Sequence, residues 1–344
     1  MTKLRSVLIL TGREARILRT GSTYMLNRRH TLLGLGAVAA LAATPVVATE
    51  GRLDVVATTG MIADAARQIG GADVEVTALM GAGVDPHAYR QTRSDIAAMT
   101  RADLVLWHGL YLEAQMEDFF HGLARKREVV AVAEAMPKDL LRGHDDYADK
   151  FDPHVWMSPE LWKHVVREVA RALTAARPAL ADRFAANLER HLGELDRLSD
   201  YGRRVVSGVP QENRVLVTAH DAFGYFGRDY GFEVMGLQGI STQSEAGLNR
   251  IGALVDTLVE RQIKAVFVET SVADRSMRAL IEGAAAKGHA VAIGGELFSD
   301  AMGADGTYEA TYVGMLDHNF TTIAGALGAE VPGAGMDGKL GAGH

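Results

Sequence analysis

The sequence contains no cysteine. This absence excludes disulfide bonds, thiolate metal ligands and the acylated cysteine of a bacterial lipoprotein. Repeats and low-complexity tracts are also missing, apart from a glycine-rich stretch at the end of the chain. Hydrophobic residues make up 48% of the chain and charged residues 23%. This composition is typical of a globular protein with a large core.

No apolar run is long enough to span a bilayer comfortably as a permanent anchor. Arg28 and Arg29 precede an apolar stretch at 31–43, and small residues ending at Ala48 supply a cleavage site. This pattern is typical of an export signal that is removed. We therefore predict a soluble periplasmic protein, with residues 1–48 as signal peptide and upstream extension.

Basic residues are few relative to acidic ones. Residues 1–48 carry seven Lys/Arg and one Glu, so the rest of the chain has 29 basic and 42 acidic residues and a formal charge of −13. This acidity argues against binding to nucleic acid or to anionic membranes. It is compatible with the attraction of cations, although solubility alone would also explain it.

Several enzyme motifs are missing after residue 48. The chain has no HExxH, no GxSxG and no phosphate-binding glycine loop. The GxG of GAGVDPH runs into Asp-Pro instead of a helix. We therefore expect no catalytic residues, no organic cofactor and no enzymatic activity.

Short apolar runs alternate with helical patterns along the chain, which favours an α/β fold. At 344 residues the chain exceeds what one hydrophobic core usually holds, so we expect two lobes. The runs that predict buried strands are LDVVATT, VEVTALM, DLVLWHG and EVVAVAEA in the first half, and RVLVTAH, FEVMGLQG, AVFVET and AVAIGG in the second. We predict a parallel sheet in each lobe.

One long helical pattern at 178–207 separates the two halves. Its apolar residues recur every three or four positions, at Leu180, Phe184, Leu188, Leu192, Leu195 and Leu198. Roughly 27 residues at 1.5 Å each make a rigid rod of about 40 Å, long enough to run along both lobes. We predict an N-terminal lobe at 49–177, a C-terminal lobe at 208–332 and a flexible tail at 333–344.

The tripeptide Asp-Pro-His occurs twice and places His87 and His154 after a rigid proline. His220 ends the predicted strand RVLVTAH, and Asp300 follows the strand AVAIGG and its loop. Ligands of open α/β sheets gather at the carboxyl ends of strands, so two residues from each lobe could meet in a cleft between the lobes. Three imidazoles and one carboxylate are a reasonable ligand set for zinc or manganese.

Other residues near these motifs could support the site. Asp85 and Asp152 precede the two prolines and could accept a hydrogen bond from the histidine nitrogen that faces away from the metal. An Asp before Pro is also common in ordinary turns. His108 ends the strand DLVLWHG and is a further candidate for a ligand or supporting group. His144, in the acidic segment LLRGHDDYADK, could capture metal transiently, although such a histidine is usually just solvated.

In this order, GVDPHAY, FDPHVWMSP, VTAHDAFGYF and GGELFSDAMG resemble the zinc/manganese-binding family of ABC-transporter substrate-binding proteins, also called cluster A-I or cluster 9. The resemblance covers essentially the whole chain after residue 48. It implies two (β/α) lobes bridged by one rigid helix, with a metal ion bound between them by His87, His154, His220 and Asp300. It also implies delivery of the ion to a membrane permease driven by a cytoplasmic ATPase. We expect a monomer.

Two departures from the family pattern concern the choice of metal. Zinc-dedicated members commonly carry a His-rich loop before the second ligand, whereas residues 138–153 contain only His144. Manganese-dedicated members commonly have Glu at the third position, where this chain has His220. Three imidazoles favour zinc over manganese, as the general order of affinities also does. Supply in the periplasm could reverse this outcome.

A periplasmic zinc-dependent hydrolase is the alternative hypothesis. Three histidines and an aspartate with an open coordination position could activate a water molecule. Glu269 and Glu296 are the obvious spare carboxylates near strand ends, and either could be purely structural. An adhesin has no sequence feature in its support.

Overall fold

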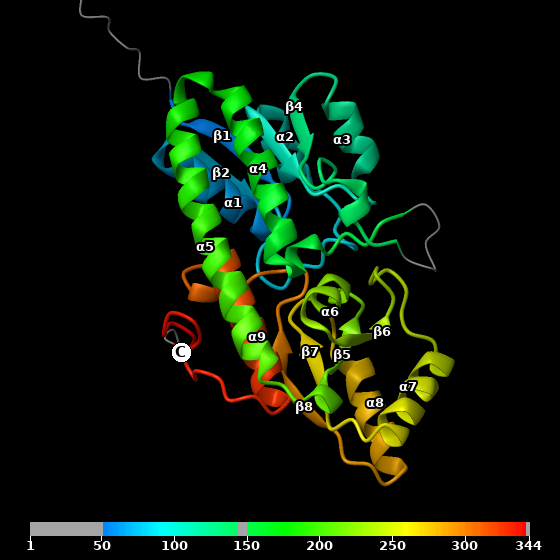
Figure 1. Ribbon diagram of the computed structural model, residues 1–344. Coiled ribbons are helices and arrows are strands. Elements are labelled where there is room, and N and C mark those ends of the chain that lie inside the picture. The colour runs from blue at the N-terminus through cyan, green and yellow to red at the C-terminus, as the bar shows by residue number, and fades with distance from the viewer. Residues whose placement is uncertain (1–50, 144–149, 342–344) are drawn as a thin grey trace, which may run out of the picture. The chain divides into compact units, whose positions relative to one another are not determined.

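The computed structural model describes residues 51–143 and 150–341. The predicted signal peptide, its cleavage site and His144 lie outside these residues. The described chain forms two lobes, each a sheet with helices around it, and one long helix runs along both (Figure 1). Within the described residues, no helix has the length and apolar character that a membrane span requires.

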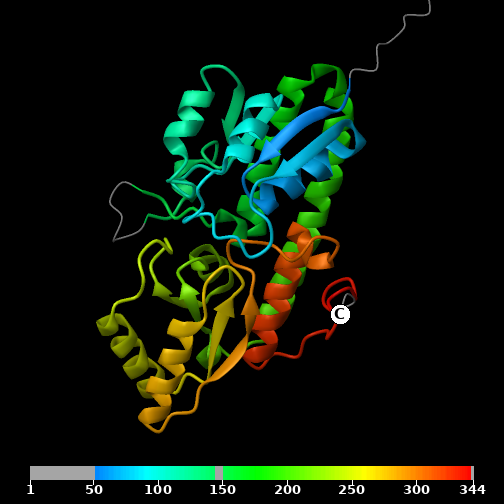
Figure 2. The same ribbon diagram turned by 180° about the vertical axis from the view of Figure 1, so that it is seen from behind.

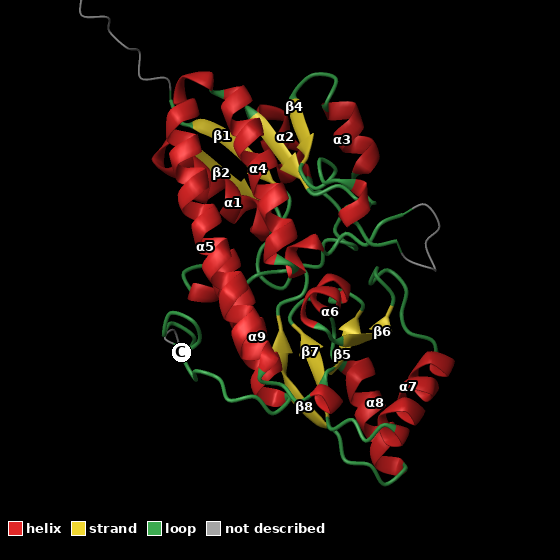
Figure 3. Cartoon of the chain, viewed as in Figure 1, coloured by secondary structure: helices red, strands yellow, loops and turns green. Residues whose placement is uncertain are grey.

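The first lobe is built on a four-stranded parallel sheet with strand order β2-β1-β3-β4. Its elements are β1 (Leu53–Ala57), α1 (Gly60–Gly70), β2 (Val74–Ala78), α2 (Arg93–Arg101), β3 (Leu104–Trp107), α3 (Glu117–Leu123), β4 (Glu128–Ala131) and α4 (Pro159–Ala176). Helices α1 and α4 cover one face, and α2 and α3 cover the other (Figure 3). With both faces covered, β1 and β3 are almost entirely buried, which explains their continuous apolar sequences.

The second lobe contains two parallel strand pairs, β5-β6 and β7-β8, which meet through β5 and β7. Its elements are β5 (Val215–His220), α6 (Gly224–Tyr230), β6 (Glu233–Gln238), α7 (Leu248–Glu260), β7 (Ala265–Glu269), α8 (Arg275–Ala286), β8 (Ala292–Leu297) and α9 (Tyr312–Ala326). Each of the eight predicted strands is therefore present, and the predicted α/β class with parallel sheets is confirmed.

Helix α5 (Ala181–Ser207) joins the two lobes and follows a short 3-10 turn at Pro178–Leu180. It packs on α1 and α4 of the first lobe and on α6 and α9 of the second, and Figure 2 shows it from behind, passing along α9. Its apolar face is buried along its length, from Phe184 to Val206. A bend in α5 would therefore disturb buried contacts in both lobes, which makes the helix a stiff connection.

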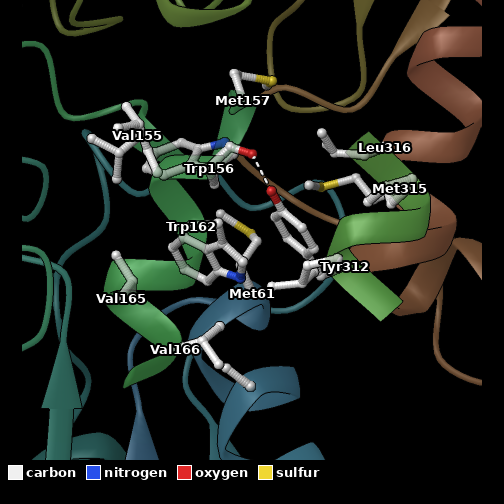
Figure 4. Close-up of a cluster of buried hydrophobic side chains, with 14 of the residues drawn as sticks. Met61, Val155, Trp156, Met157, Trp162, Val165, Val166, Tyr312, Met315 and Leu316 are labelled. Carbon is white, nitrogen blue, oxygen red and sulfur yellow. Dashed lines mark hydrogen bonds between the residues drawn. The ribbon is translucent and has the colours of Figure 1, made fainter. Parts of the chain in front are cut away.

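An apolar cluster lies where α1, α4 and α9 come together, between the two lobes (Figure 4). The rings of Trp162 and Tyr312 stack with centroids 5.2 Å apart and planes 15° apart. The hydroxyl of Tyr312 donates to the carbonyl of Trp156 at 2.7 Å. Both tryptophans and the tyrosine are fully buried. Residues from both lobes thus share one core at this edge.

The described part of the glycine-rich tail, up to residue 341, contacts helix α9 and the core. The backbone N–H of Met336 donates to both carboxylate oxygens of Asp317 in α9, each at 2.9 Å. Met336 also packs against the core. Gly335 adopts a φ of 73°, which permits the tight turn that returns the chain to α9. Gly335 thus allows the turn that brings Met336 to Asp317, and the flexibility of the tail stays a prediction.

Candidate metal centre

The structure brings the four predicted ligands together. One side-chain nitrogen or oxygen from each of His87, His154, His220 and Asp300 lies within 4.8 Å of the others. His87 and His154 lie in loops of the first lobe, His220 ends β5, and Asp300 follows β8. All four side chains are buried. The carboxyl ends of strands from both lobes thus converge on one cluster, as the sequence predicts.

His154 is held by its own Asp-Pro-His motif. Asp152 Oδ1 accepts the backbone N–H of His154 at 3.0 Å and its ring Nδ1–H at 2.7 Å. Because a carboxylate can only accept, the Nδ1 proton is fixed and Nε2 faces the cluster. Ser158 caps α4 by accepting the N–H of Leu161, with Pro159 in the first turn, and so ends this loop. The predicted supporting role of Asp152 is observed.

The first Asp-Pro-His motif works differently. Asp85 Oδ1 accepts the backbone N–H of His87 at 2.8 Å, and Oδ2 accepts the hydroxyl of Thr242 at 2.5 Å. The carboxylate therefore holds the loop rather than the imidazole ring, which corrects the expectation for Asp85. The same tripeptide therefore serves two purposes: Asp85 binds a hydroxyl of the second lobe, whereas Asp152 binds the ring of its own histidine.

His220 is oriented by Glu269 at the end of β7. Glu269 Oε1 accepts the backbone N–H of His220 at 3.0 Å, and Oε2 accepts its ring Nδ1–H. Both side chains are buried. Strands β5 and β7 lie next to each other, so the ends of these strands place the pair. As with His154, this bond leaves Nε2 directed at the cluster.

Asp300 supplies the negative charge of the cluster. Its Oδ2 lies 3.2 Å from Nε2 of His220 and 4.0 Å from Nε2 of His87, and its Oδ1 lies 3.5 Å from Nε2 of His154. Neither oxygen has a hydrogen-bond partner of good geometry among the described residues. Such a buried carboxylate is costly unless a cation or other partner satisfies it.

The electrostatics of the cluster follow from burial and from these pairs. Burial lowers the pKa of His87 to about 3 despite the attraction of Asp300. Burial acts in the same direction on His154, but the hydrogen bond to Asp152 and the nearby carboxylate of Asp300 outweigh it and raise its pKa to about 9.

In His220 and Asp300, burial and the neighbouring charges again shift the pKa in opposite directions. Burial lowers the pKa of His220, but the charges of Asp300 and Glu269 outweigh it and raise that pKa well above its ordinary value. Burial raises the pKa of Asp300, yet the neighbouring histidines hold it well below its ordinary value. Asp300 therefore remains a carboxylate, which suits a cation.

Most of the spacings between the donor atoms fit one small divalent ion. Ligands about 2.0–2.2 Å from a tetrahedral zinc ion lie roughly 3.3–3.6 Å from one another. Nε2 of His154 lies 3.3 Å from Nε2 of His87 and 3.3 Å from Nε2 of His220. The distances from Asp300 to His220, 3.2 Å, and to His154, 3.5 Å, are close to this range, whereas Asp300 Oδ2 lies 4.0 Å from Nε2 of His87, which is wider than a tetrahedral zinc ion requires. Catalytic zinc sites keep one position for water.

The other sequence candidates lie outside the cluster. His108 is fully buried, and its Nε2 donates to the carbonyl of Pro153 at 2.8 Å, so it supports the loop that carries His154. Glu296 is exposed in β8.

Sequence reasoning missed other residues that hold the site in place. The indole N–H of Trp156 donates to the carbonyl of Ser299, next to Asp300, at 2.6 Å. Thr242 and Gln243 hold the His87 loop from the second lobe. The tryptophan of FDPHVWMSP was a visible signal, whereas nothing in the sequence of the 241–243 segment indicates this role.

Comparison with known proteins gives a consistent result. The family model described as "Zinc-uptake complex component A periplasmic" matches residues 55–326. The chain is 50% identical over 276 residues to the manganese-binding lipoprotein MntA of Bacillus subtilis, covering 80% of this chain and 90% of the relative. It is 46% identical over 280 residues to the zinc-binding protein TroA of Treponema pallidum, covering 81% and 90%.

A solved structure has the same fold. The periplasmic zinc-binding protein TroA from Treponema pallidum superimposes with a TM-score of 0.79 at 46% identity, and the match covers 80% of this chain and 99% of that one. The matched family and the relatives are metal-binding transport proteins. Nothing in the comparisons supports the hydrolase alternative.

Proposed function

Because the chain belongs to the family of periplasmic components A of zinc-uptake complexes, we propose that it captures one divalent metal ion with His87, His154, His220 and Asp300. The observation that carries this proposal is the buried set of four side chains, each of which offers one donor atom within 4.8 Å of the others.

The chain is the substrate-binding component of an ABC metal transporter, and its ion is zinc or manganese. It delivers this ion to the membrane permease. Its location is periplasmic or extracellular, as for its relatives. The ion is cargo here, so the site must bind it tightly and also give it up.

We propose zinc as the preferred metal. Three imidazole nitrogens and one carboxylate oxygen suit zinc better than manganese, which takes harder oxygen ligands and more of them. The proton on Nδ1 of His154 and of His220 is bound by Asp152 and Glu269, respectively. These carboxylates orient each ring and make its Nε2 a better donor. Both relatives described above resemble this chain about equally, so overall similarity does not decide the metal.

Release is proposed to require contact with the permease. Helix α5 packs on both lobes and limits their relative motion to a small rigid-body displacement. Docking that shifts one lobe slightly would separate His87 and His154 from His220 and Asp300. We also propose that export removes residues 1–48, so the working protein begins near Thr49.

Native mass spectrometry with elemental analysis of protein purified from the periplasm tests this function. We expect one zinc or manganese ion per chain. Alanine at each of His87, His154, His220 and Asp300 should lower affinity strongly, while His121→Ala, on the exposed face of α3, should leave it unchanged. A wild-type protein without saturable binding of either metal would refute the proposal, and metal-dependent hydrolysis would favour the enzyme alternative.

A further inference from the structure

A polar contact joins the lobes beside the metal centre, through the segment that follows β6. The hydroxyl of Thr242 donates to Asp85 Oδ2 at 2.5 Å, and Gln243 Nε2 donates to the backbone carbonyl of His87 at 2.9 Å. Oδ1 of the same Asp85 accepts the backbone N–H of His87 at 2.8 Å. The backbone carbonyl of His87 is thus bound by Gln243 of the second lobe, and its backbone N–H is bound by Asp85, which Thr242 of the second lobe holds in turn.

The orientation of the Gln243 amide is determined by its partners. A backbone carbonyl can only accept, so the amide NH2 must face His87. The amide oxygen, Oε1, then accepts a hydrogen bond from Gln115 Nε2 at 3.2 Å, from the first lobe. One glutamine side chain therefore bridges two points of the first lobe and has a single productive orientation.

Near His154 and Asp300 the two lobes are joined by buried aromatic packing instead of hydrogen bonds near solvent. Trp156 Nε1 donates to the carbonyl of Ser299, and this tryptophan lies fully buried beside Tyr312 (Figure 4). Separating the lobes there would expose large aromatic surfaces to water. Thr242 is half-buried and Gln243 is exposed, so their hydrogen bonds can exchange with water at low cost.

A small cavity lies beside His87. It has a volume of about 20 Å³ and is lined by His87, Tyr111, Phe151, Ile240 and Ser241, among others. This is room for about one water molecule. Ile240 and Ser241 directly precede Thr242. Movement of this segment would therefore widen the cavity next to His87.

We propose that Thr242 and Gln243 form a latch that positions His87 on the ion and controls how fast the ion leaves. Both are positioning residues, since they act through Asp85 and the backbone of His87. The inference rests on the proposed function, because it takes His87 as a ligand.

The test measures zinc release into excess chelator from folded protein loaded with one equivalent of zinc. Thr242→Val keeps the side-chain shape but cannot donate to Asp85, and Gln243→Met keeps length but cannot donate to His87. Loss of one such hydrogen bond should raise the dissociation rate roughly fivefold to tenfold. The association rate should change little, because the ligands remain in place.

Two control variants make the comparison specific. Thr242→Ser retains the hydroxyl and should release zinc within about twofold of the wild-type rate. Ser244→Ala lies in the same segment, where the Ser244 side chain makes no hydrogen bond to the described residues, and it should also match wild type. Melting temperatures of the metal-free variants monitor the fold.

The possible outcomes distinguish failure of the latch proposal from failure of the proposed metal-binding function. If Thr242→Val and Gln243→Met release zinc at the wild-type rate while His87→Ala loses affinity, the latch is refuted and the proposed function stands. Lower melting temperatures with unchanged release would refute it too, because a purely structural role predicts that result. If wild type binds neither zinc nor manganese, or if His87→Ala binds the ion with unchanged affinity, the proposed function fails first.

Discussion

Raising the pH should strengthen zinc binding steeply, because protons and the ion compete for the same imidazole nitrogens. Burial lowers the pKa of His154, yet its hydrogen bond to Asp152 and the nearby carboxylate of Asp300 raise it to about 9. The pKa of His220 is raised well above its ordinary value despite burial, by Asp300 and Glu269. Their Nδ1 atoms already donate to carboxylates, so the additional proton sits on Nε2, where the ion must bind.

The expected magnitude follows from the number of protons displaced. One displaced proton makes the affinity rise about tenfold per pH unit, and two make it rise about a hundredfold. Between pH 6 and pH 8, displacement from His154 alone predicts a gain of roughly a hundredfold. Displacement from His220 as well would steepen this dependence further.

The stability of the metal-free protein should show the opposite dependence. The folded-state pKa of His154, about 9, lies above the ordinary value of 6.5. Its contribution, on the order of 3 kcal/mol, is therefore fully present below pH 6.5 and is lost as the pH rises through 9. The gap in melting temperature between zinc-bound and metal-free protein should widen as the pH rises over this window.

Calorimetric titration in two buffers of different ionisation enthalpy would count the released protons directly. We expect at least one proton per zinc ion at pH 7, and melting curves from pH 6 to 9 would check the widening gap. A binding constant that stays flat from pH 6 to 8 with no proton release would show that the imidazoles are already neutral. The electrostatic reasoning for His154 and His220 would then be wrong.

Three further predictions test the metal choice, the processed start and the connecting helix. His220→Glu exchanges an imidazole nitrogen for a hard oxygen, so competitive titration should show a smaller preference for zinc over manganese. His220→Ala should lower the affinity for both metals. An unchanged affinity ratio in His220→Glu together with an unchanged affinity in His220→Ala would show that His220 is not a ligand. N-terminal sequencing of periplasmic protein should begin within a few residues of Thr49, and an intact Met1 would contradict export. Gly202→Ala should lower the free energy of unfolding by about 1–3 kcal/mol, because its Cβ would lie 2.6 Å from the Phe320 ring, while Gly193→Ala, with open space, should not be destabilising.

Much of the fold could be predicted from local sequence, because parallel strands buried on both faces must be continuously apolar. RVLVTAH predicts β5 with His220 at its end, and the structure has β5 at Val215–His220. The repeat of apolar residues after Pro178 likewise predicts the helix that becomes α5, at Ala181–Ser207. The apolar run of β5 and the apolar repeat of α5 can both be recognised from residues that are close together in the sequence.

The contacts that hold the site in place could not be predicted in the same way. Asp85 and Asp152 occupy identical tripeptides, yet one binds a threonine hydroxyl from the second lobe and the other binds the ring of its own histidine. The partner of Asp85 lies 157 residues away in the sequence. The tail shows the same limit, since only the fold places Asp317 where it can accept the N–H of Met336.

The two kinds of contact between the lobes differ in strength, so we expect the lobes to separate first beside His87 when the ion is released. Trp156 and Tyr312 hold one edge through buried aromatic packing, whereas Thr242 and Gln243 hold His87 through hydrogen bonds near solvent. A small rotation that preserves the packing of α5 would break the weaker contacts first. Loss of His87 would leave three donors and an open position, from which an ion exchanges more readily than from a filled tetrahedron. Release then requires the breaking of a few polar contacts rather than the separation of an apolar core.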